Sequence, residues 1–334
     1  MPLSDIERIL TQIARAQERF PNTSFVETPM FEPLAHTDPA GVNAIRSRVL
    51  GSVDPVISSS GPAIGIRADW ESQLRRLKEL GTEMIAITLH GPAPIHDRLV
   101  SRPGASDLTR LAATRIRDAG LGLAVNVMLN NATLEQFDAF TSEVAQMGIR
   151  ELYFPIAVYL PHGRLRAYER HRPTLERIEP HAERIAELET GSSERWRNLA
   201  TMTEATYVST ALQNGRDTEW KYFDGRQSID LAVLSNLDVT DGDINYPRRH
   251  YGNLRTDELV DILESVIEAD ERGEYAGPTD PASFFAFPED AHSIPPVADV
   301  AEAVGDSAST RIHTRPESMH LLWLDRYFAS RRRL

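Results

Sequence analysis

Short apolar runs alternate with amphipathic helical stretches through the first half of the chain, and this alternation limits the folds that the chain can adopt. Five runs have the length and composition of buried strands: residues 24–28, 55–59, 84–91, 122–129 and 151–160. Helical patterns separate them, with apolar residues three to four positions apart. Each strand–helix unit spans about 30 residues, which indicates right-handed βαβ crossovers and a parallel sheet.

No dinucleotide-binding fingerprint such as GxGxxG follows the first of these runs. The alternation therefore favours an α/β fold of the partial (β/α) barrel type over a nucleotide-binding doubly wound sheet. In either architecture, functional side chains are expected at the carboxyl ends of the strands. The N-terminal stretch, residues 3–19, predicts an amphipathic helix in which Ile6, Leu10 and Ile13 share the buried face.

The pattern changes in the second half of the chain. Residues 1–170 are expected to form the partial barrel, and residues 171–334 a helical, loop-rich C-terminal extension that packs on it. Within the extension, residues 273–316 are rich in Pro, Asp, Ser and Ala and predict loops. Residues 318–330 predict a last amphipathic helix.

The sequence contains no cysteine. These residues therefore cannot form disulfides, zinc–thiolate sites or thiolate-ligated iron–sulfur clusters. The net charge of −13 argues against a nucleic-acid-binding surface, which needs basic residues to displace counterions. No run of about 18 apolar residues predicts a membrane span, and the N-terminus lacks the pattern of a signal peptide. We expect a cytoplasmic protein with a small-molecule ligand.

Several segments at the predicted strand ends resemble motifs of the radical S-adenosylmethionine (SAM) superfamily. EPLAHTD at residues 32–38 resembles the motif GGEPLLHPD, although Met30 and Phe31 replace its two glycines. Residues 87–111 are similar to the family stretch with a Ser/Thr strand end, His-Asp, Arg and a Gly-Ala turn, and NVMLN at 126–130 resembles the fifth strand. More loosely, residues 241–263 resemble the C-terminal region of SPASM-type members, where a GN(L/I) turn precedes a helix.

The resemblance implies a partial barrel of the radical SAM type that binds SAM at its strand ends. Glu32 and Pro33 would contact the methionine end of SAM. Further contacts are implied for Ser60, Gly61, Thr88 and Asn126. Because the family's iron–sulfur cluster needs thiolates, this sequence provides no cluster of its own.

Arg164 follows the last predicted strand. It is a candidate for a bidentate contact with a carboxylate or phosphate group of a ligand. A surface salt-bridge role is the alternative for this residue.

Three residues at the end of the third predicted strand and in the loop that follows it are candidates for catalysis: His90, His96 and Asp97. They could act as a base or as a metal-binding pair, or His96 and Asp97 could anchor the loop by hydrogen bonds. A site of Glu32, His36 and His90 would have the two-histidine, one-carboxylate composition of ferrous iron sites. We assign no residue to a metal ion from the sequence alone.

Three hypotheses about function are open at this point. The first is a cluster-free protein that binds SAM-like or amino-acid-like molecules, or an accessory partner of a biosynthetic protein. The second is a non-radical lyase, isomerase or SAM-dependent transferase that uses the same pocket. The third is an N-terminally incomplete radical SAM enzyme.

Overall fold

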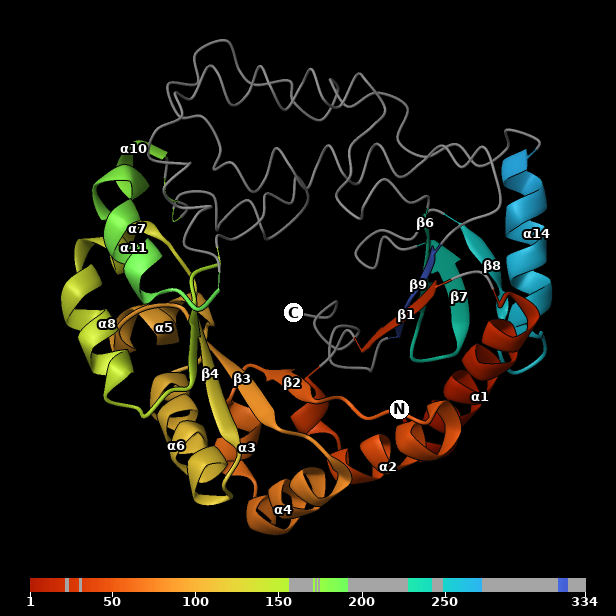
Figure 1. Cartoon of the computed structure of the whole chain (residues 1–334), viewed down its shortest axis with the longest axis horizontal. Helices are drawn as coiled ribbons and strands as arrows, with labels where there is room; N and C mark the ends of the chain where they lie inside the picture. Colours follow the sequence, from red (N-terminus) through yellow and green to blue (C-terminus); the bar gives the residue numbers. More distant parts are fainter. Residues whose placement is uncertain are drawn as a thin grey trace. The chain divides into compact units, whose positions relative to one another are not determined.

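The computed structural model describes residues 1–21, 24–29, 32–155, 171, 173, 175–191, 228–241, 249–271 and 318–323. The chain divides into two compact units. Unit 1 comprises Met1–Val53, Thr218–Pro281 and Gly305–Leu334, and unit 2 comprises Asp54–Asp217 and Ala282–Val304. Figure 1 labels most of the helices and strands of both units.

Unit 2 is built on a four-stranded parallel sheet in the order β2-β3-β4-β5. Its strands are Val56–Ser59 (β2), Met84–Leu89 (β3), Gly122–Val127 (β4) and Glu151–Tyr153 (β5). Strands that follow one another along the chain are neighbours in the sheet, so the segments between them are crossovers. The predicted α/β class and the parallel sheet are confirmed for these four strands.

Helices of unit 2 cover one face of this sheet. Figure 1 shows α6 and α8 on one side of β3 and β4. The residues that face them alternate along the strands, and Ile85, Ile87 and Val125 are fully buried. The helices are α3 (Pro62–Ile66), α4 (Trp70–Leu80), α5 (Ala93–Leu99), α6 (Ala105–Asp118), α7 (Asn131–Glu135), α8 (Phe137–Ala145), α10 (Leu175–Ile178), η3 (Glu179–His181) and α11 (Ala182–Leu188).

Unit 1 contains a five-stranded mixed sheet in the order β1-β9-β6-β7-β8. The first three of these strands are parallel, and β6, β7 and β8 form an antiparallel meander. The strands are β1 (Ser24–Pro29), β6 (Ser228–Val233), β7 (Asp238–Asp241), β8 (His250–Asn253) and β9 (Ser318–Trp323), and the helices are α1 (Leu3–Arg19), η1 (Pro33–Ala35), α2 (Pro39–Leu50) and α14 (Leu259–Glu271).

The predicted N-terminal helix is confirmed as α1. Ile6, Leu10 and Ile13 are at most 1% exposed and pack in one core with residues of β6, β7 and α14. Their spacing places them on one face of the helix. The apolar stripe of α1 is therefore used to build the core of unit 1.

Two expectations about strand arrangement are wrong. The first strand does not join the series of the next four, because β1 pairs with β9 near the other end of the chain. The amphipathic helix expected over residues 318–330 is instead the strand β9 over residues 318–323. Its backbone pairs with β1 on one side and β6 on the other, and a helix could supply neither ladder.

The predicted division at residue 170 lies outside the described residues and stays a prediction, as do the loops expected over residues 273–316. Among the helices that the structure describes, none is both long and apolar enough to cross a membrane.

Candidate functional site

A row of polar side chains crosses the face of the unit 2 sheet opposite the helices. Thr88 on β3 is the register partner of Asn126 on β4, and Asn126 is in turn the partner of Tyr153 on β5. Register partners on neighbouring strands point to the same face, about 5 Å apart. All three side chains are partly exposed. The structure thus brings together Thr88 and Asn126, which the sequence motifs predicted separately.

Thr88 and Asn126 have hydrogen-bonding groups that no described residue uses. Each is the penultimate residue of its strand, so both lie near the carboxyl edge of the parallel sheet. In the described part of the chain, neither the Thr88 hydroxyl nor the Asn126 side-chain amide has a hydrogen-bond partner. This edge is where parallel α/β sheets bind ligands. The two groups can therefore donate to and accept from a small molecule placed there.

Glu151 lies beside this row, because it is the register partner of Ala124 and is two residues from Tyr153 on β5. The Tyr153 hydroxyl donates a hydrogen bond to Oε2 of Glu151 over 2.7 Å. This hydrogen bond raises the pKa of Tyr153, and burial and the charge of Glu189 raise it further. Sequence reasoning missed both residues. Their spacing of two along a strand, which places them on one face, is the signal that could have found them.

The predicted Ser60–Gly61 turn at the end of β2 is held against α6. The Gly61 N–H donates to Oγ of Ser59 over 3.0 Å. The Thr109 hydroxyl, which donates to the Ala105 carbonyl oxygen over 2.9 Å, lies 3.4 Å from the carbonyl oxygen of Ser60. Gly61 has a φ of 95°, and a Cβ there would lie 2.8 Å from Cγ2 of Thr109. Glycine is thus required for backbone conformation and for close packing on α6.

Asp97 anchors the loop that precedes α6. Its two carboxylate oxygens accept backbone N–H groups, from Gly104 over 2.6 Å and from Ser106 over 2.7 Å. The hydrogen bonds from Ser106 and Gly104 lower the pKa of Asp97. This geometry agrees with the loop-anchoring interpretation. The catalytic role of Asp97 stays a prediction. Both of its carboxylate oxygens already accept a backbone N–H, so this geometry adds no support for that role.

His90 and His96 lie next to each other at the end of β3. The backbone N–H of His90 donates to Nδ1 of His96 over 3.1 Å, and the ring centroids are 5.6 Å apart. His96 therefore carries its proton on Nε2. Within the described residues, that nitrogen and Nδ1 of His90 are both buried without a hydrogen-bond partner. Burial, together with the nearby His96, lowers the pKa of His90 to about 4.

The depressed pKa of His90 predicts that the protein loses stability in mild acid. The folded state keeps His90 neutral, whereas the unfolded chain binds a proton near pH 6.5. The contribution of His90 to stability is therefore complete above about pH 6.5 and is lost as the pH falls towards about 4. With an allowance for screening at a partly exposed ring, we expect a loss of about 1–2 kcal/mol at about pH 4.5. Urea unfolding of wild type and of His90→Gln at neutral and acidic pH measures this loss of unfolding free energy. If the variant has the same pH dependence as the wild type, His90 is not its cause.

The candidates near the start of η1 lie in unit 1. Glu32 and Pro33 are at the first turn of this short helix. The His36 ring contacts the Met1 carbonyl oxygen through Nε2 and the Asp38 N–H through Nδ1, both over 3.0 Å. Both ring nitrogens of His36 are therefore engaged within unit 1, which does not favour a metal-binding role.

Metal binding gains no support from the other candidates. Among the described residues, no group of three or more His, Asp or Glu side chains could hold a metal ion. The site of Glu32, His36 and His90 draws on residues of both units and stays a prediction. Arg164 is outside the described residues, and its contact with a ligand stays a prediction.

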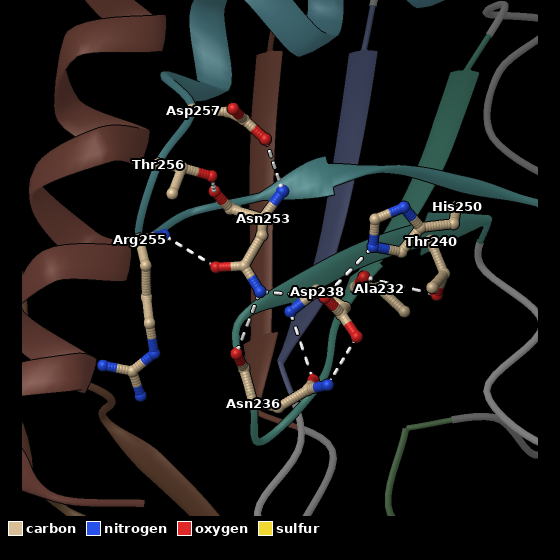
Figure 2. Close-up of polar contacts among 9 residues, drawn as sticks. All are labelled: Ala232, Asn236, Asp238, Thr240, His250, Asn253, Arg255, Thr256 and Asp257. Atoms are coloured by element: carbon tan, nitrogen blue, oxygen red, sulfur yellow. Dashed lines mark hydrogen bonds and ion pairs between the residues drawn. The ribbon is translucent and has the colours of Figure 1, made fainter.

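The C-terminal turn that resembles SPASM-type members has a structural role. Figure 2 shows Asn253 at the centre of a polar network between β7 and β8. Its side-chain amide donates to Oδ1 of Asp238 over 2.8 Å, its Oδ1 accepts the Arg255 N–H over 2.9 Å, and its own N–H donates to Asp257 over 2.7 Å. His250 adds a contact with Asp238 over 3.0 Å. Asn253 is thus committed to holding this turn.

Comparison with known proteins identifies the fold. No protein-family model and no curated protein sequence matches the chain. Among solved structures, native anSMEcpe with bound AdoMet is 12% identical, with a TM-score of 0.51 over 79% of this chain and 71% of that one. The same protein with bound AdoMet and the Cp18Cys peptide gives 13% identity, a TM-score of 0.51, and 79% and 72% coverage. At this identity the likeness shows the fold alone, an α/β fold like that of anSMEcpe.

The donor chemistry of these residues does not fit an iron–sulfur cluster. The 334 residues contain no cysteine, and cluster iron is held by thiolates. No reaction step through a cluster can therefore be assigned to them. The polar row on unit 2 does fit the hydroxyl, amino and ring nitrogen groups of a nucleoside such as AdoMet, because it offers a hydroxyl and an amide without partners among the described residues.

Proposed function

We propose that this chain is a cluster-free protein of the radical SAM fold that binds SAM or a similar small molecule at the carboxyl edge of the unit 2 sheet. The observation that carries the proposal is the pairing of Thr88 with Asn126 on neighbouring strands, with polar groups that have no other partner in the described part of the chain. AdoMet-bound neighbours with this fold support the choice of ligand.

The roles of individual residues follow from their surroundings. Thr88 and Asn126 would hydrogen-bond the ligand. The Ser60–Gly61 turn would border the site, with Gly61 packed closely against Thr109 of α6. Contacts from Glu32 and Pro33 to the methionine end, and from Arg164 to a carboxylate, are proposals from the resemblance.

An enzyme that uses the same residues for metal or acid–base chemistry has less support. The pKa of His90 is lowered to about 4, so its ring is a weak base at neutral pH. Both oxygens of Asp97 are occupied by backbone N–H groups. An accessory or binding role agrees better with this arrangement.

Calorimetric titration with SAM tests the proposal. We expect saturable binding by the wild type, and a loss of about tenfold in affinity in each of Thr88→Val and Asn126→Ala, since a hydrogen bond contributes about 1.4 kcal/mol. Thr114→Val is the matched control, because the Thr114 hydroxyl is exposed on α6 and bonds only its own helix. No binding by the wild type, or wild-type affinity in both site variants, would refute the proposed site.

A further inference from the structure

Glu151 and Tyr153 form a fixed pair beside the Thr88–Asn126 row. They are two residues apart on β5, so their side chains leave the same face of the sheet. The Tyr153 ring packs against the cluster of Met84, Ala86 and Ala124, and its hydroxyl is hydrogen-bonded to Glu151. Packing therefore holds the Tyr153 ring, and the Tyr153 hydroxyl holds the Glu151 carboxylate. Tyr153 is the register partner of Asn126.

This pair carries negative charge that no cation neutralises within the described residues. No Arg, Lys or His side chain there forms an ion pair with Glu151, although the side chain is only partly exposed. A second carboxylate, that of Glu189, lies close enough to act on Tyr153 and is placed by its hydrogen bond from the Phe154 N–H, over 3.1 Å. Glu151 therefore places a negative charge beside the aromatic ring of Tyr153 at this end of the row.

Carboxylates and aromatic faces both attract cations. A cation near a carboxylate in a partly desolvated site gains several times the Coulomb energy that it would gain in water. A cation over a tyrosine ring is also attracted by the ring quadrupole, and quaternary ammonium groups are recognised in this way. A neutral ligand group gains neither contribution.

We propose that Glu151 and Tyr153 are a subsite that selects a positively charged group, such as a sulfonium or a methylated ammonium, on the small molecule held by Thr88 and Asn126. This inference rests on the proposed function for its ligand. It assigns the recognition of charge to β5 and the recognition of hydroxyl or ring nitrogen groups to β3 and β4.

Binding of SAM and of S-adenosylhomocysteine tests the subsite, because these ligands differ by the methyl group that makes the sulfur a cation. We expect the wild type to bind SAM about tenfold more tightly than the neutral thioether. In Glu151→Gln this preference should fall to near one, mainly through weaker SAM binding. Glutamine still accepts the Tyr153 hydrogen bond, so a role in holding the ring alone would leave the preference unchanged. Glu79→Gln on the exposed face of α4 makes the same charge change as a control.

Two results would overturn the subsite: equal affinity of the wild type for the two ligands, or an unchanged preference in Glu151→Gln. If neither nucleoside binds, the proposed function fails, and the subsite is tested separately with trimethylsulfonium and dimethyl sulfide by saturation-transfer NMR. A signal from the cation alone that is lost in Glu151→Gln supports the subsite. Absence of any Glu151-dependent signal rejects it.

Discussion

Replacing Gly65 by alanine is expected to lower the free energy of unfolding by about 3 kcal/mol, the upper end of the usual cost of overpacking. Gly65 is buried in α3 where this helix meets α6, and a Cβ there would lie 2.4 Å from the carbonyl oxygen of Leu108. The obstructing atoms are backbone, so no side-chain rotation relieves the contact and the two helices must move apart. The gain in helix propensity, at most about 1 kcal/mol, does not offset this cost.

Urea denaturation followed by circular dichroism measures the effect. Gly104→Ala in the same unit is the control, because Gly104 has a φ of 75° but an added Cβ would meet no other atom within 4 Å. Only backbone strain, about 1 kcal/mol, is expected there. A Gly65→Ala variant as stable as Gly104→Ala would show that α3 and α6 can separate at little cost.

Much of unit 2 was predictable because its determinants are local. Strand-length apolar runs followed by helical patterns identified β2 to β5, and helix–strand alternation implied their parallel order. The placement of β1 was not predictable in this way. A strand pattern states which residues are extended but not which strand they pair with, and the partner of β1 is β9 near the opposite end of the chain. Residues 318–323 were mistaken for a helix because the strands that hold them extended, β1 and β6, are distant in the sequence.

The candidate site was predictable in part. Thr88 and Asn126 could be predicted because polar residues near the ends of parallel strands meet at one edge of a sheet. That the two are register partners could not be known from the sequence. Glu151 and Tyr153 were missed because the period of two at the start of the run of residues 151–160 was not used.

His36 shows a different limit of sequence reasoning. A histidine beside a carboxylate in a predicted strand-end loop suggests a metal ligand. The ring instead contacts the Met1 carbonyl oxygen and the Asp38 N–H. Both partners are backbone atoms, which sequence patterns of side chains do not reveal.

Replacing Asp97 by alanine is expected to cost about 2 kcal/mol of stability, because two backbone N–H groups lose a charged acceptor near the start of α6. Asp97→Asn should cost nearly as much. One of its two side-chain positions becomes an amide nitrogen, which would face the N–H of either Gly104 or Ser106 as a second donor. Urea denaturation of both variants measures these costs. Ser72→Ala provides a matched control, because the exposed Ser72 hydroxyl bonds only the Asp69 carbonyl oxygen at the start of α4.

The Asn variant also separates the two interpretations of Asp97. An anchoring carboxylate acts through stability, so both Asp97 variants should unfold at lower urea concentration and, while folded, keep their SAM affinity within about threefold of wild type. A carboxylate that contacts the ligand would lose affinity by about tenfold or more even where the fold is intact. Because both oxygens already accept backbone N–H groups, we expect the first result. The loop from His90 to Gly104 would then serve to hold the end of β3 in place, and recognition of the ligand would belong to the side chains of the sheet face.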